Sequence, residues 1–158
     1  MSSVHCFDND GLIHLAAADS LAFASAVYGI FVENDRLLLL SQKSTQLYAP
    51  PGCILTFHQV PTQAIRHYFR RLAAITPNLG PLLLLEDQYR WLDGRAWRIA
   101  AMYYAVSRPF TAAIYLNETL EPDATPTWID PDALQRDQFL FGYKAVTAGI
   151  SRLNPARR

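Results

Sequence analysis

Residues 51–75 read PGCILTFHQVPTQAIRHYFRRLAAI, and this stretch decides the expected fold. A proline-glycine break leads into a loop, and Pro61 follows where the first turn of a helix tolerates proline. From Ala64 onward, apolar residues recur at intervals of three and four, which predicts an amphipathic helix that ends before the Thr-Pro-Asn at 76–78. The other face of this helix carries only polar side chains: Gln63, Arg66, His67, Arg70 and Arg71.

The helix lies within a stretch, residues 36–85, that contains no Asp or Glu. All 14 acidic residues of the chain lie outside it, five before and nine after. The same stretch carries the following basic side chains: Arg36, Lys43, His58, Arg66, His67, Arg70 and Arg71. The formal net charge of the chain is zero, so any preference for anions would belong to this region and not to the whole molecule.

Composition predicts one globular, cytoplasmic domain. The 158 residues suffice for a single core, 51% of them are hydrophobic, and no apolar run is long enough to span a bilayer. Cys6 and Cys53 fit neither a disulfide framework nor a zinc site, and no signal peptide is evident. The neutral net charge favours neither nucleic acid nor a membrane as partner. We expect a lead-in at 1–21, a core at 22–152 and a tail at 153–158.

The remaining pattern predicts a mixed sheet with a central and a terminal helix, an α/β sandwich. Strands are expected at 22–32 and 36–41 around a turn at 33–35, and at 82–91 and 96–107 around Asp93-Gly94. Residues 110–117 are a further strand candidate, and residues 118–126 are expected to form a loop. A short strand is expected at residues 128–129, followed by a helical turn at residues 130–132. A last helix should pack on the sheet through Phe139, Tyr143, Val146, Ile150 and Leu153.

This order of elements over residues 22–152 resembles the Nudix hydrolase fold, an α/β/α sandwich. The family's box runs Gly, five residues, Glu, seven residues, then Arg-Glu, an apolar residue, any residue, Glu-Glu, any residue, Gly and an apolar residue. The positions that match the box and its usual flanks are Pro51, Gly52, Pro61, Ala64, Phe69 and Ile75. The segment from Thr127 to Leu134 is also similar to the tryptophan segment that often closes these domains.

The box is degenerate in either of two registers. In the first register, the glycine is replaced by Cys53, the first glutamate by Gln59, the arginine by His67, the other glutamates by Tyr68, Arg71 and Leu72, and the last glycine by Ala74. The second register, one residue earlier, keeps Gly52 and Arg66 but puts His58, His67, Arg70 and Arg71 at the glutamate positions. Neither register recovers a carboxylate.

The resemblance implies magnesium chemistry that these residues do not provide. Magnesium requires oxygen ligands, whereas arginine stays protonated and repels the ion. His58 and His67 could ligate a softer metal, but their spacing across a loop and a helix is a weak signal. We therefore predict no metal and no cofactor, with magnesium expected only if the protein is a hydrolase.

The basic helix face could instead contact a phosphate or carboxylate directly, through Arg66, His67, Arg70 and Arg71. The alternative is a solvated face without a ligand. Tyr48, Phe57, His58 and Trp91 are further ligand candidates on loops and turns, whereas Trp97 and Tyr103 are expected in the core. Cys53 could act as a nucleophile with His58 as its base, or simply fill space.

Three functions remain open. The favoured hypothesis is a binding module without hydrolytic activity that recognises a nucleotide-like or other anionic small molecule, or a protein partner. The second is a hydrolase with relocated metal ligands, for which the nearby acids are Glu86, Asp87, Glu118 and Glu121. The third is a structural subunit in which the apolar hairpin forms a homodimer face.

Overall fold

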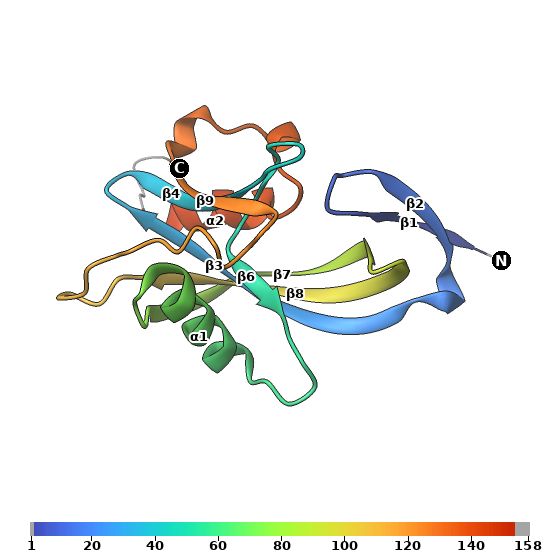
Figure 1. Ribbon diagram of the computed structural model, residues 1–158, viewed down its shortest axis with the longest axis horizontal. Coiled ribbons are helices and arrows are strands. Elements are labelled where there is room, and N and C mark those ends of the chain that lie inside the picture. The colour runs from blue at the N-terminus through green and yellow to red at the C-terminus, as the bar shows by residue number, and fades with distance from the viewer. Residues whose placement is uncertain (1, 154–158) are drawn as a thin grey trace.

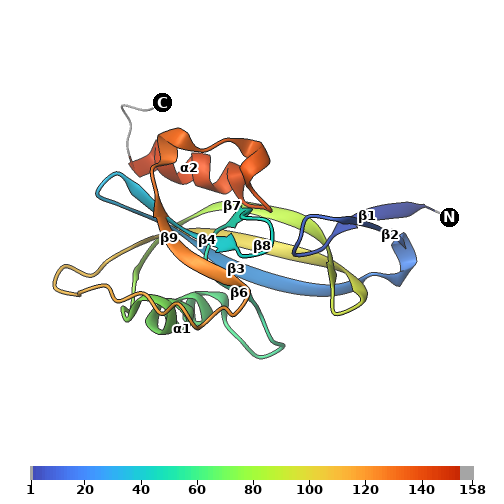
Figure 2. The same cartoon turned by 45° about the horizontal axis from the view of Figure 1, so that its top comes forward.

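The computed structural model describes residues 2–153, the side chain of Leu153 excepted. The predicted packing of Leu153, and the predicted tail apart from the backbone of its first residue, therefore lie outside the described residues. A mixed sheet runs in the order β2-β1-β7-β8-β3-β4-β5, with β6 and β9 paired to β3 and β4. The helices α1 (Pro61–Ala73) and α2 (Tyr143–Leu153) cover opposite faces of this sheet (Figures 1 and 2). The predicted α/β/α sandwich is confirmed.

Both predicted hairpins are present. β3 (Ala22–Glu33) and β4 (Arg36–Gln42) join through Asn34 and Asp35. β7 (Asn78–Leu92) and β8 (Arg95–Ser107) join through Asp93 and Gly94. All four turn residues have positive φ, which asparagine, aspartate and glycine adopt more readily than other residues. β3 and β8 pair in parallel, which makes the sheet mixed.

The lead-in at 1–21 contains a hairpin that the sequence analysis did not identify. β1 (Ser3–Phe7) and β2 (Ile13–Ala17) are antiparallel, and Phe7 pairs in parallel with Arg90 of β7. The carboxylate of Asp8 closes the turn between them by accepting hydrogen bonds from the amides of Asp10 and Leu12. The hairpin therefore extends the sheet beside β7 (Figure 1).

Residues 110–117 form no strand, contrary to the prediction. Instead, the amides of Tyr115 and Asn117 donate to the carbonyls of Ala73 and Leu72, which are left without helical partners at the end of α1. A segment with a strand-like composition thus supplies hydrogen-bond donors to the free carbonyl groups at the C-terminal end of α1.

Two other predicted boundaries also move. β9 (Ala124–Ile129) begins four residues before the expected short strand, inside the predicted loop, and pairs with β4. Its Pro126 is tolerated because β4 is the one described strand that borders β9, so one side of β9 needs no amide donor. Phe139 lies before α2, which begins at Tyr143 after Gly142 with φ 91°.

Two short strands lie on either side of Pro50 and Pro51: β5 (Tyr48–Ala49) and β6 (Gly52–Ile54). Gly52, expected in the proline-glycine break, is thus the first residue of a strand. β6 pairs with the middle of β3, and Gly52 lies so close to β3 that a Cβ on it would meet the carbonyl oxygen of Val27 at 2.1 Å. Only glycine fits at this position. After β6, residues 55–60 connect the sheet to α1.

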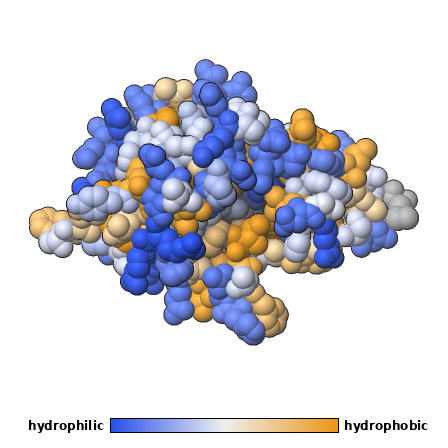
Figure 3. Space-filling model, in the orientation of Figure 1, coloured by the Kyte–Doolittle hydropathy of each residue, from blue (hydrophilic) through white to orange (hydrophobic). Residues whose placement is uncertain are grey.

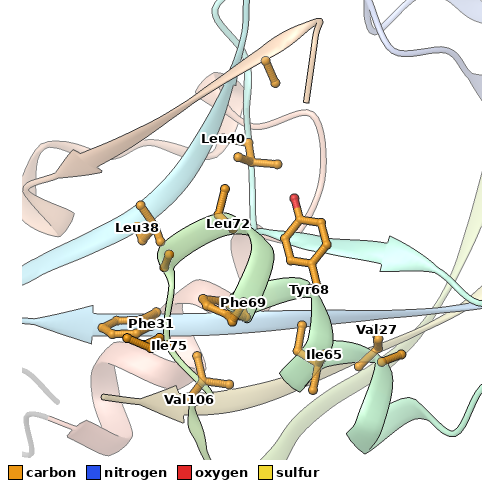
Figure 4. Packing of buried hydrophobic residues seen from close by; sticks show 13 residues of the cluster. Val27, Phe31, Leu38, Leu40, Ile65, Tyr68, Phe69, Leu72, Ile75 and Val106 are labelled. Atoms are coloured by element: carbon orange, nitrogen blue, oxygen red, sulfur yellow. The ribbon is translucent and has the colours of Figure 1, made fainter. Parts of the chain in front are cut away.

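The core has one cluster on each face of the sheet. Under α1, Ile65, Phe69 and Leu72 pack against Val27 and Phe31 of β3, and all five are fully buried (Figure 4). Under α2, the second cluster contains Tyr28, Ile30, Ile99, Tyr103 and Val146. No helix within residues 2–153 is both long and apolar enough to cross a membrane.

Candidate ligand-binding site

The inner face of α1 meets the loop that precedes β9 through the side chains of Tyr68 and Glu121. Tyr68 is 6% exposed, and its hydroxyl donates a 2.9 Å hydrogen bond to Oε1 of Glu121. Figure 4 shows this hydroxyl pointing away from Ile65 and Val27, toward the side of the cluster on which Leu40 lies. Burial, and then the charge of Glu121, raise the pKa of Tyr68 above its ordinary range, so the group stays a neutral donor. Leu72, one helical turn later on the same face, is fully buried.

The basic side chains of α1 lie on its outer face. Arg66, His67, Arg70 and Arg71 are all exposed, and Nε and a terminal nitrogen of Arg70 donate to Oγ1 of Thr76 at 3.0 and 2.7 Å. None of the four lines a described cavity. Their contact with an anion stays a prediction, and it would occur on the open surface.

The structure separates the aromatic ligand candidates. Tyr48 makes an edge contact with Phe139, with ring centroids 6.1 Å apart, and packs against the cluster under α2. Trp91 stacks on His14 at 4.8 Å with the ring planes 3° apart.

The other two aromatic candidates lie in the loop before α1. Phe57 is 95% exposed and makes an edge contact with His58. Phe57 also borders the largest described cavity, of about 790 Å³, together with Trp97, which is half-buried. Tyr103, by contrast, is fully buried as predicted.

The acidic candidates also lie apart. Glu86 accepts a 2.7 Å hydrogen bond from the Tyr103 hydroxyl, whereas Asp87 pairs with Arg98 at 2.7 Å. Because Glu86 and Asp87 are neighbours on one strand, they face opposite sides of the sheet. Glu118 is exposed on a loop, and Glu121 is bonded to Tyr68. Within residues 2–153, no three His, Cys, Asp or Glu side chains are grouped so that they could hold a metal ion.

Cys53 lies in an environment unlike that of a nucleophile. Burial, and then the charge of Glu121, raise the pKa of the Cys53 thiol, whereas an activated cysteine needs a lowered pKa. His58, its proposed base, is exposed against Phe57. This environment fits better with the alternative prediction, in which Cys53 is a small apolar side chain that fills space and has no catalytic role.

Arg90 on β7 is not among the site residues predicted from the sequence, and its side chain is only 3% exposed. One terminal nitrogen donates to Oδ1 of Asn9 at 2.6 Å, and the guanidinium carbon lies 4.6 and 5.0 Å from the ring centroids of Phe7 and Phe141. Its Nε has no hydrogen-bond partner within residues 2–153, and none of the ion pairs found there includes Arg90. Desolvation lowers the pKa of Arg90. A buried charge without a counter-ion in direct contact is unfavourable, so the burial of Arg90 has a cost in folding free energy that these contacts do not fully offset.

Arg90 borders a cavity of about 340 Å³ that extends to the loop before β9. Glu121 and Cys53 line this cavity as well, together with Tyr28 of β3 and Phe141. The cavity therefore brings the buried arginine and the carboxylate bonded to Tyr68 to one space.

Solved structures with a similar fold include Nudix hydrolases. A MutT Nudix hydrolase from Burkholderia pseudomallei is similar with a TM-score of 0.56 and 19% identity, over 73% of this chain and 88% of that one. The chain has a Nudix-like fold. A Nudix hydrolase from Nitrosomonas europaea is similar with a TM-score of 0.59 and 13% identity, over 87% of this chain and 92% of that one.

A third similar structure, from Francisella tularensis, is described as a bifunctional NMN adenylyltransferase/ADP ribose pyrophosphatase complexed with AMP and a manganese ion. Its TM-score is 0.58 and its identity 17%, over 84% of this chain and 42% of that one. The chain matches no protein-family model and no curated protein. At these identities the similarity establishes the Nudix-like fold and not an activity.

Proposed function

We propose that this Nudix-fold protein binds a nucleotide-like or other anionic small molecule without hydrolysing it. The observation that carries the proposal is the hydrogen bond between Tyr68 and Glu121, with Leu72 buried one turn along the same face of α1. The resemblance would place metal-ligating glutamates at the positions of Tyr68 and Leu72.

The end of α1 supports the first of the two box registers. The box closes with a glycine, and helices commonly end on a glycine in the left-handed region. Ala74 has φ 59° and ψ 25° directly after the helix, whereas Ala73 is still helical. In that register the glutamate positions of the helix carry a hydroxyl (Tyr68), an exposed guanidinium (Arg71) and a buried isobutyl group (Leu72).

These side chains do not fit magnesium. The ion prefers six oxygen ligands in near-octahedral geometry. Glu121 supplies a carboxylate, but its Oε1 accepts the Tyr68 hydroxyl, and Leu72 has no donor atom to offer. We therefore derive no hydrolytic step from this site.

A hydrolase with relocated ligands is the less favoured alternative. It would require Glu86, Asp87, Glu118 and Glu121 to converge on one ion. Glu86 and Asp87 point to opposite sides of the sheet, each with its own partner, and Glu118 is exposed on a loop. A large rearrangement would be needed to bring them together.

An exposed apolar surface supports a homodimer as a second proposal, compatible with the first. Phe23 is 73% exposed, Ile54 41% and Phe57 95%, and all three border the cavity of about 790 Å³. Figure 3 shows apolar side chains exposed over β6 and the loop after it. Sedimentation velocity of the wild type and of the Phe23→Ser, Phe57→Ser variant tests this proposal. A monomeric wild type would contradict it.

The binding function is tested with nucleoside diphosphate derivatives, with and without magnesium. We expect no turnover above background, and thermal stabilisation by at least one nucleotide in the absence of metal, because a ligand specific for the native state raises its stability. Robust turnover that a chelator abolishes would contradict the proposal.

A further inference from the structure

Arg90 lies in the interior of the fold, at the cavity bordered by β3, β6 and the loop before β9. We propose that Arg90 anchors the anionic group of a small polar ligand in this cavity. The inference rests on the proposed binding function and assigns its site to Arg90, a residue that the basic face of α1 does not include.

The contacts of the guanidinium leave hydrogen-bonding capacity unused. Arginine has five N–H donors, and a buried structural arginine normally directs them to carboxylates or carbonyls. Here Asn9 accepts one bond, and Nε has no partner within the described part of the chain. Asp8 acts on Arg90 only through space, because its carboxylate is bonded to His14 at 2.8 Å.

Two aromatic rings hold the guanidinium in place. Phe7 from the N-terminal hairpin and Phe141 from the segment before α2 both lie within cation–π distance of it. A guanidinium held by rings and by one amide oxygen is pre-organised to accept a carboxylate or a phosphate through two parallel hydrogen bonds. A ligand would thus supply an anion in direct contact with Arg90, whereas Asp8 acts on it only through space.

The other groups around the cavity define the rest of the ligand. Glu121 and Asp123 line it and offer carboxylate oxygens as hydrogen-bond acceptors, and Tyr28 lies within electrostatic range of both Arg90 and Glu121. Burial raises the pKa of Tyr28 to about 12, so its hydroxyl stays protonated. The fitting molecule carries one anionic group for Arg90 and hydroxyl or amino donors for the carboxylates. A cavity of about 340 Å³ accommodates a small metabolite.

The test measures the binding of acetate, L-serine and AMP by calorimetry and thermal shift in the absence of divalent metal. Acetate offers an anion alone, L-serine a carboxylate with donors, and AMP a phosphate with ribose hydroxyls. We expect L-serine or AMP to bind more tightly than acetate, and the tighter of the two identifies the anionic group. Binding by none of the three overturns the proposal.

Variants of Arg90 test whether this residue binds the anionic group. Arg90→Met should weaken binding of the tighter probe at least about tenfold, because a charge-assisted bidentate contact is lost. Arg90→Lys keeps the charge without the fork and should be intermediate. Arg152→Met, which removes an exposed arginine of α2, is the matched control and should bind like the wild type. Equal affinity of folded Arg90→Met and wild type overturns the proposal.

A measurement on the wild type covers the case in which the Arg90 variants fail to fold. The Nε–H resonances of arginine side chains are followed by NMR while the tighter probe is added. The Nε–H of Arg90, slow to exchange because it is buried, should shift on saturation. Binding that leaves every slowly exchanging arginine resonance in place overturns the proposal. Binding elsewhere refutes the Arg90 site alone, whereas metal-dependent turnover of a nucleoside diphosphate refutes the non-hydrolytic function alone.

Discussion

Tyr68 and Glu121 are 53 residues apart in the sequence, and a 2.9 Å hydrogen bond joins them on the inner face of α1. The bond ties the helix to the loop that leads into β9, and Glu121 also lines the cavity that Arg90 borders. The proposed function depends on this contact. The resemblance would place a metal ion beside position 68, whereas here the carboxylate of Glu121 is bonded to the neutral hydroxyl of Tyr68.

The energetic coupling of this pair can be measured by a double-mutant cycle. Tyr68→Phe removes the donor, and Glu121→Gln weakens the acceptor. We expect each change to lower the free energy of unfolding by about 1 kcal/mol, because Glu121 is partly exposed and water replaces part of the lost bond. Urea unfolding of the two single variants and the double variant should give a coupling energy of about 1 kcal/mol. Strictly additive effects would show that the bond does not form in solution.

The end of α1 gives a second test. Ala74 adopts a left-handed conformation with φ 59°, which costs a residue with a Cβ about 1–2 kcal/mol, partly offset in a glycine variant by the greater freedom of the unfolded chain. Ala74→Gly should therefore raise the free energy of unfolding by about 0.5–1 kcal/mol. Ala73→Gly, the adjacent control inside the helix, should lower it by about 1 kcal/mol or more. Destabilisation by both changes would place the helix end elsewhere.

Much of the fold follows from local signals in the sequence. Pro61 and the Thr-Pro-Asn at 76–78 bracket α1 correctly, and Asp93-Gly94 marks the turn between β7 and β8. Residues 110–117 were wrongly predicted as a strand because their alternation serves a tertiary role, the satisfaction of carbonyls at the end of α1. The Asp-Asn-Asp-Gly turn at 8–11 was a usable signal for the N-terminal hairpin.

The candidate site is harder to predict from sequence. Arg90 shares one face of β7 with Gln88 and Glu86, and such a polar face is typical of the side of a strand that contacts water. Its burial depends on Phe7 and Phe141, which come from opposite ends of the chain. A single sequence contains no signal for such contacts. Periodicity did identify Tyr68 and Leu72 as inward-facing, but only the fold reveals Glu121 beside Tyr68.

The basic face of α1 and the cavity at Arg90 give different expectations for a variant with Arg70→Ala and Arg71→Ala. Both side chains are exposed and border no described cavity. We expect the affinity for the tighter of L-serine and AMP to change by less than about twofold, since exposed charges contribute little at physiological salt. Calorimetry of this variant checks the expectation. A large loss of affinity would transfer the binding site to the helix surface.

Stability at acid pH should depend on Asp8. Its hydrogen bond with His14 is the main cause that lowers the pKa of this carboxyl. A carboxyl with a lowered folded-state pKa stabilises the fold above its unfolded pKa of about 4, and the contribution is lost as the pH falls through the folded value. The wild type should thus lose more stability than Asp8→Asn between about pH 5 and about pH 2. Parallel urea midpoints for the two proteins over this range would contradict the pairing.

The central claim is that the inner face of α1, with Tyr68 bonded to Glu121 and Leu72 buried, holds no divalent ion. Titration with Mn²⁺, followed by electron paramagnetic resonance, tests it most directly, because bound Mn²⁺ loses the sharp signal of the hydrated ion. We predict that the wild-type protein, at millimolar concentration, leaves the signal of the hydrated Mn²⁺ ion undiminished. Saturable loss of that signal in the wild type, abolished by Glu121→Gln, would contradict the account.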